Sequence, residues 1–100
     1  MSFLKALFSR KFQDESYIEH WIEKLAHRED PCEYLREVSF DSVAQFMTDR
    51  RARVLSTGEP YPDESNLYRL SLRGRYYDVM ATRSFDRAGV LLTSEFSETL

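Results

Sequence analysis

The chain has 100 residues, of which 42% are hydrophobic and 14% aromatic, and its formal net charge at pH 7 is −3. This length fits a single domain, and the apolar content is sufficient for one hydrophobic core, which argues against a wholly disordered chain. The slight acidity disfavours general affinity for nucleic acids, because phosphate binding needs a cationic surface. The single cysteine excludes an internal disulfide bond and a cysteine-only zinc site, and it favours a reducing, cytoplasmic setting.

The N-terminal segment, residues 1–12, is predicted to form an amphipathic helix of its own, and residues 13–100 are predicted to form one domain. Apolar residues recur in the segment at close to helical spacing, and its three basic residues are not balanced by any acid. One interpretation is that this helix packs on the domain or on a second copy. The other is that Phe3, Leu4, Leu7 and Phe8 enter the interface of a membrane.

Three further helices are predicted between residues 15 and 55. The first spans about residues 15–28, where one face is apolar. The second, residues 31–37, begins at Asp30-Pro31-Cys32-Glu33, whose residue types fit an N-cap, a first helical turn and a capping box. In the third, Ser39 is predicted to be the N-cap. That helix is expected to continue to about Leu55 and to end at Gly58 in a left-handed conformation.

Residues 67–96 are predicted to form a three-stranded antiparallel meander, with a hairpin that turns at Gly74. Alternation places four large side chains on one face of the hairpin: Leu70, Leu72, Tyr77 and Val79. Two hairpin registers keep this face, with the loop at residues 74–75 or at residues 73–74, and the second places Arg69 opposite Asp78. The expected fold is therefore α+β, with about 3–4 N-terminal helices followed by a three-stranded antiparallel β-meander. Trp21 and Phe46 are expected to cover one face of that meander.

The sequence contains no phosphate-binding glycine loop, no nucleophile elbow and no zinc-protease motif. His20 and His27 share a predicted helical face, but about 10 Å separates them along a helix, which is too far for both to ligate one zinc ion. Cys32 lies among acidic residues, which disfavour a reactive thiolate. We therefore expect no enzymatic activity, no cofactor, and no catalytic or metal-ligating residues.

The tip of the hairpin carries residue types that are common at protein interfaces. They are Arg69, Arg73, Arg75 and Tyr76. The leading prediction is a cytoplasmic, non-enzymatic protein-interaction or regulatory module that binds a protein through this face or through an exposed strand edge. A homodimer formed by edge pairing is one version of this prediction.

Two alternative functions use other residues. A set of arginines lies at the end of the long third helix and on the hairpin: Arg50, Arg51, Arg53, Arg73 and Arg75. Helices followed by a two-stranded hairpin resemble the topology of winged-helix DNA-binding proteins, and this resemblance implies a regulator that binds nucleic acid. The second alternative is a peripheral membrane protein that binds through residues 2–12.

Overall fold

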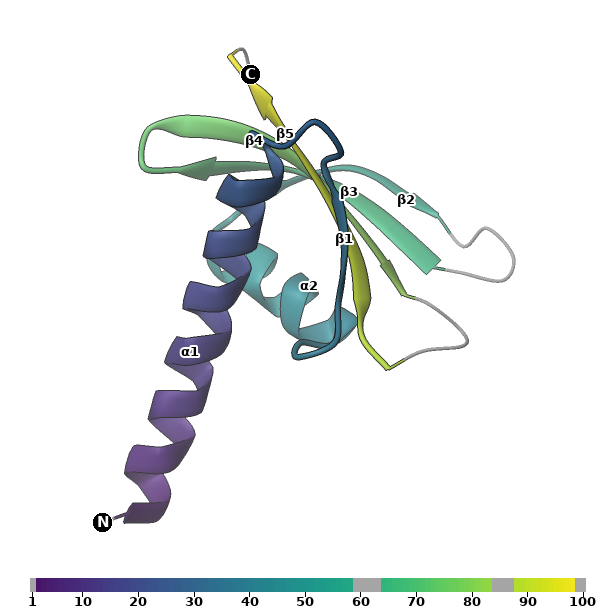
Figure 1. The fold of residues 1–100 in the computed structure, drawn as a ribbon. Coiled ribbons are helices and arrows are strands. Elements are labelled where there is room, and N and C mark those ends of the chain that lie inside the picture. Colours follow the sequence, from purple (N-terminus) through teal and green to yellow (C-terminus); the bar gives the residue numbers. More distant parts are fainter. Residues whose placement is uncertain (1, 59–63, 84–87, 99–100) are drawn as a thin grey trace.

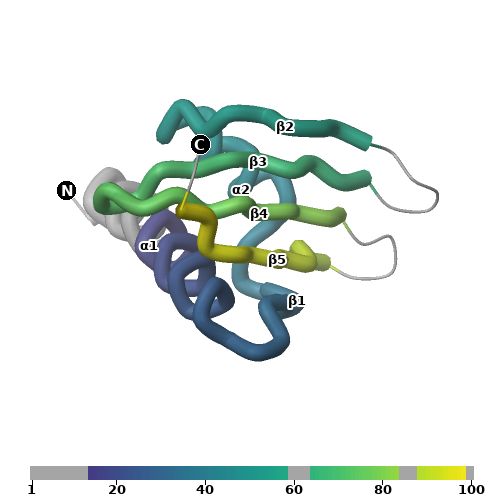
Figure 2. Tube along the Cα trace, turned by 90° about the horizontal axis from the view of Figure 1, so that it is seen from above, coloured from purple at the N-terminus to yellow at the C-terminus, as the bar shows by residue number. Residues whose placement is uncertain are grey.

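The computed structural model describes residues 2–58, 64–83 and 88–98, and it describes side chains from residue 14 onward. This part of the chain forms a small α+β fold with two helices and one five-stranded antiparallel sheet. The elements are α1 (Ser2–Leu25), β1 (Cys32–Leu35), α2 (Phe40–Asp49), β2 (Arg53–Gly58), β3 (Glu64–Leu72), β4 (Arg75–Arg83) and β5 (Val90–Ser97). The strand order is β1-β5-β4-β3-β2, and both helices lie on the same face of the sheet (Figures 1 and 2).

Helix α1 runs without a break from Ser2 to Leu25, so the predicted division into two helices, residues 2–12 and 15–28, is wrong. The range contains no glycine or proline, and nothing in it prevents the backbone hydrogen bonds from continuing past residues 13 and 14. The last three turns bury Ile18, Ile22 and Leu25 against the sheet. The side chains of the predicted membrane-binding residues Phe3, Leu4, Leu7 and Phe8 lie outside the described residues.

The predicted helix over residues 31–37 is also wrong, because Cys32–Leu35 is strand β1. This strand pairs antiparallel with β5, and the backbone N–H of Ser94 donates to the carbonyl oxygen of Pro31 at 3.1 Å. Leu35 lies opposite Val90, and both side chains are buried. An isolated helix of two turns is marginal, whereas the extended chain gains a hydrogen-bonded ladder and buries Leu35. Tertiary pairing therefore overrides the local capping signal.

Helix α2 begins as predicted, with Ser39 as its N-cap, whose hydroxyl oxygen accepts a hydrogen bond from the backbone N–H of Ser42 at 3.1 Å. It ends at Asp49 instead of Leu55. Arg51 takes a left-handed φ of 55°, and Arg53–Gly58 then forms strand β2. Gly58 is consequently the last residue of a strand and does not cap a helix.

The hairpin of β3 and β4 is present, with Arg73 and Gly74 as its two-residue loop. Their φ angles of 50° and 79° fit a type I′ turn, whose twist matches that of the flanking strands. The structure adopts the register that places Arg69 opposite Asp78. The predicted count of three strands is wrong, because β1 and β2 extend the meander on both sides.

The core lies between the helices and one face of the sheet. It contains the four hairpin residues predicted to share a face, together with Phe46, and all five are buried. Trp21 is only partly buried and packs against the margin of this core. The one buried polar residue among those described is Ser94 of β5. Phe46 therefore covers the sheet from within the core, as predicted, whereas Trp21 contacts the core only from its periphery.

The start of β5 is held closely to β1 through Gly89. This residue has a φ of 139°, and a Cβ atom there would overlap the carbonyl oxygen of Leu35 and the ring of Tyr34. The hydroxyl of Tyr34 donates to the carbonyl oxygen of Ala88 at 2.6 Å. The close approach requires glycine, and it fixes where the short edge strand ends.

Candidate functional site

The face of the sheet opposite α1 and α2, here called the outer face, is open in the part of the chain that the structure describes (Figure 2). Residues paired in an antiparallel ladder point to the same side, so the registers define rows of outward side chains across the sheet. The charged row contains Arg53, Arg69, Asp78 and Glu95. The next row contains Ser56, Leu67, Met80, Thr93 and Cys32, and the third contains Ser65, Thr82, Leu91 and Tyr34.

The centre of the outer face is apolar. Met80 on β4 is 40% exposed and Leu91 on β5 is 36% exposed, while Leu67 and Tyr34 beside them are half-buried. Contiguous apolar side chains on a surface usually mark a site of interaction. The centre of this face therefore has the character of a binding surface for another macromolecule.

The charged row separates its signs across the sheet. Arginines stand on β2 and β3, and carboxylates stand on β4 and β5. In the middle, Arg69 donates from Nε and Nη2 to the two carboxylate oxygens of Asp78, at 2.8 and 3.0 Å, and this contact raises the pKa of Arg69. At the two ends, Arg53 and Glu95 are exposed, and neither forms an ion pair with another described residue. The row is therefore cationic on β2 and β3 and anionic on β4 and β5.

The four predicted partner-binding residues do not form one patch. Arg69 and Tyr76 lie on the outer face. Arg73 turns toward α1, where its Nη1 donates to Glu23 Oε1 at 2.5 Å and its Nη2 lies 3.6 Å from Glu19 Oε1. Arg75 pairs with Leu72 on the helix side, with its guanidinium 5.8 Å from the ring centre of Phe96. The structure thus brings two of the four residues together.

The arginines of the nucleic-acid alternative are also divided. Arg50 lies 3.7 and 3.4 Å from the carboxylates of Glu15 and Glu19, and it stacks over the ring of Phe46. Arg50 and Arg73 are thereby neutralised by acids of α1, whereas Arg51 and Arg53 are exposed. The hairpin strands are internal strands of the sheet with neighbours on both sides, so the topological resemblance to a winged-helix protein is not upheld.

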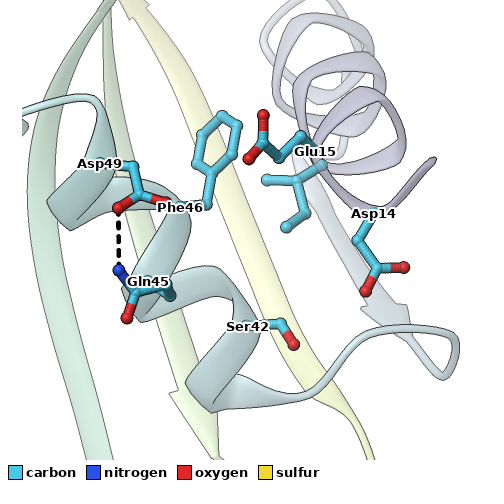
Figure 3. Close-up of a pocket in the computed structure, with 7 residues that line it drawn as sticks. Asp14, Glu15, Ser42, Gln45, Phe46 and Asp49 are labelled. Atoms are coloured by element: carbon cyan, nitrogen blue, oxygen red, sulfur yellow. Dashed lines mark hydrogen bonds between the residues drawn. The ribbon is translucent and has the colours of Figure 1, made fainter. Parts of the chain in front are cut away.

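A pocket of about 210 Å³ lies between α1 and α2 (Figure 3). Its lining residues are Asp14, Glu15, Ile18, Ser42, Gln45, Phe46 and Asp49. Gln45 Nε2 donates to Asp49 Oδ1 at 2.8 Å across one wall, as Figure 3 shows. Sites for organic ligands usually enclose about 300–1,000 Å³. The pocket is smaller than this range, and its polar lining is mainly acidic.

The two histidines, His20 on α1 and His27 in the turn that follows it, both contact aromatic rings. His20 lies edge-on to Trp21, and His27 stacks on Phe96. Glu23, which lies between them in sequence, pairs with Arg73. Among the described residues, no three histidine, cysteine or acidic side chains are placed to hold a metal ion. Cys32 is half-buried on the edge strand β1, at the margin of the outer face.

Comparisons with protein-family models, with curated proteins and with solved structures found no match to this chain. No helix in the described residues has the length and apolar content needed to cross a membrane. The sequence does not indicate the open apolar centre, because its local pattern predicts a helix at Tyr34 and because neither Leu67 nor Leu91 stands out locally. The signal that could have found it is the strand alternation, which places Met80 on the face of its strand that points away from the core.

Proposed function

We propose that this protein is a non-enzymatic interaction module that binds another protein through the outer face of its sheet. The observation that carries the proposal is the apolar centre of that face, where Met80 and Leu91 are 40% and 36% exposed. The helices cover only the other face of the same sheet (Figure 1). Burial of these side chains by a partner would supply the hydrophobic part of the binding free energy.

The composition of the outer face supports a protein partner. Methionine, tyrosine and arginine are enriched at protein interfaces, and this face carries Met80, Tyr34, Tyr76 and Arg69. Charged residues stand to one side of the apolar centre, as in interfaces that combine an apolar core with a polar rim. A cytoplasmic location agrees with the single cysteine and is part of the proposal.

The proposal is tested by capture from the source cell with immobilised wild-type protein and two variants. Met80→Arg places a charge in the centre of the outer face, and we expect it to abolish partner capture. Val54→Arg is the matched control, because Val54 is 53% exposed on the edge strand but points to the helix side, opposite Tyr68. Equal capture by wild type and Met80→Arg, or loss of capture only with Val54→Arg, would contradict the proposal.

The two alternatives lead to separate measurements. Nucleic-acid binding would give a fluorescence anisotropy change with duplex or single-stranded DNA at low ionic strength, where the electrostatic attraction is strongest. Membrane binding would make the full chain pellet with anionic vesicles more than a chain that begins at Gln13. We expect no binding of DNA, since Arg50 and Arg73 are paired with acids of α1.

A further inference from the structure

We propose, resting on the function proposed above, that the partner is a second copy of this chain. The two copies would pack with their outer faces together, about a two-fold axis that runs along the seam between β3 and β4. Such an axis places β3 of one copy over β4 of the other, and β2 over β5. The interface is then isologous, with the same residues contributed by each copy.

The charged row is self-complementary about this axis. Because the signs run from arginines on β2 and β3 to carboxylates on β4 and β5, rotation sets each cation over an anion of the second copy. Arg69 faces Asp78 of the second copy, and Arg53 faces Glu95 of the second copy. Within one chain, Arg53 and Glu95 stand three strands apart, or about 14 Å, and cannot pair. The dimer therefore gives partners to the two residues at the ends of the row.

The apolar centre obeys the same symmetry. Leu67 on β3 and Met80 on β4 are paired in the same row, so the rotation places Leu67 over Met80 of the second copy. In the following row, Ser65 faces Thr82 of the second copy. An axis perpendicular to the strands through the Leu67–Met80 row would instead place Arg69 over Ser65 and Asp78 over Thr82, with no ion pair between copies. Charge complementarity thus selects the axis along the strands.

The area of the outer face is sufficient for a weak specific dimer. The four strands that overlap about this axis, β2 to β5, are spaced about 4.8 Å apart, and their outward rows are spaced about 6.6 Å apart, which gives a contact face of roughly 19 by 26 Å. This corresponds to roughly 500 Å² in flat outline, below the about 800 Å² per partner of standard interfaces and in the range of weak ones. Face-to-face sheets pack about 10 Å apart at a small angle, so the long side chains of Arg53 and Glu95 can span the interface. We expect a dissociation constant on the order of micromolar.

The test is the mass of the full chain by sedimentation and light scattering from about 1 to about 300 μM, which brackets a micromolar dissociation constant. We expect the mass to rise with concentration from 11.9 kDa toward twice that value. Arg53→Glu and Glu95→Arg should each raise the dissociation constant about tenfold, because each variant replaces two attractive pairs per dimer with two repulsive ones. An equimolar mixture of the two variants should recover the wild-type mass, since each then supplies the charge that the other lacks.

Two further variants complete the design. Arg36→Glu changes the net charge by the same amount as Arg53→Glu but lies in the loop after β1, and it should leave the dissociation constant unchanged. Met80→Arg should give a monomer at every concentration. Circular dichroism and thermal unfolding of each variant show whether its fold is intact.

The remaining outcomes overturn the inference in distinct ways. A mass of 11.9 kDa for the wild type at every concentration excludes self-pairing. If the wild type is monomeric but Met80→Arg still abolishes capture of a different protein, the proposed function holds and only the identity of the partner as a second copy is wrong. A dimer unaffected by Met80→Arg uses another surface, which contradicts the inference, and the capture experiment then decides the proposed function by itself. A dimer weakened by Met80→Arg but insensitive to the two charge reversals has a different axis, and the inference fails.

Discussion

The two faces of the central hairpin are built from the same strands and have opposite properties. On the inner face, Leu70 and Val79 are fully buried under the helices. On the outer face, one residue along from Val79, Met80 is 40% exposed, and Arg69 pairs with Asp78. The comparison shows that one strand serves both purposes, because its side chains alternate between the two faces. Those on the inner face pack in the core, and those on the outer face form the exposed surface.

The strongest test of this division compares two large-to-small substitutions on adjacent strands. Leu70→Ala should lower the free energy of unfolding by about 2–5 kcal/mol, because it removes buried methyl groups and leaves a cavity. Met80→Ala should change it by less than about 0.5 kcal/mol, because the site is exposed and away from the core. Urea unfolding of the monomeric protein at low concentration measures both values. Similar losses for the two variants would mean that the outer face also carries the fold.

Ser94 is the one polar residue among the described buried residues of the inner face. We expect its truncation to change the free energy of unfolding in the opposite direction from that of Leu70. Its hydroxyl is fully buried with no hydrogen-bond partner among the described residues. A buried polar group without a partner costs about 1–3 kcal/mol. Ser94→Ala should therefore raise the free energy of unfolding by about 1 kcal/mol, measured in the same urea experiment. A loss of stability instead would indicate that the hydroxyl has a hydrogen-bond acceptor in solution.

The smallest predicted effect concerns the attachment of α1, which covers the inner face. Burial and the 2.9 Å hydrogen bond from the Tyr17 hydroxyl to Glu37 raise the pKa of Tyr17 above 10.0. The folded state thus favours the protonated hydroxyl, so this contribution to stability is complete below pH 10 and is lost as the pH rises through the folded-state pKa.

Thermal unfolding between pH 8 and pH 11 tests this expectation. The decline in stability of the wild type at alkaline pH should be shallower in Tyr17→Phe, which has no group to titrate at that position. Identical alkaline profiles for the wild type and Tyr17→Phe would show that Tyr17 does not link α1 to stability.

Local patterns in the sequence predicted those parts of the fold whose signals are local. The alternation around Gly74 identifies the hairpin and its buried side chains, and Ser39 identifies the start of α2. Strand β1 could not be found this way, because Asp30-Pro31-Cys32-Glu33 is a good helix start until β5 offers it a ladder. Strand β2 was missed because the chain reverses at Arg51, a residue type that seldom adopts a positive φ.

The candidate site was harder to predict than the fold. Arg73 and Arg75 share the hairpin tip in sequence, but Arg73 is paired with acids of α1, fifty residues earlier in the chain, and is not available on the outer face. The apolar centre of the outer face joins Tyr34 from β1 with Leu67, Met80 and Leu91 from three later strands. Such a surface can be recognised only once the strand order is known, because no single segment of the chain contains all of its residues.

The two edge strands of the sheet, β1 and β2, limit how many chains an assembly can contain. β1 has only four residues and follows Pro31, which has no amide hydrogen to donate, and the ladder of β2 shifts register between Val54 and Ser56. Both features discourage the addition of strands from neighbouring molecules. Association through a flat side stops at two molecules, whereas association through borders could continue into a fibril. The assembly proposed for the outer face is therefore closed at two chains, and the edges of the sheet do not extend it.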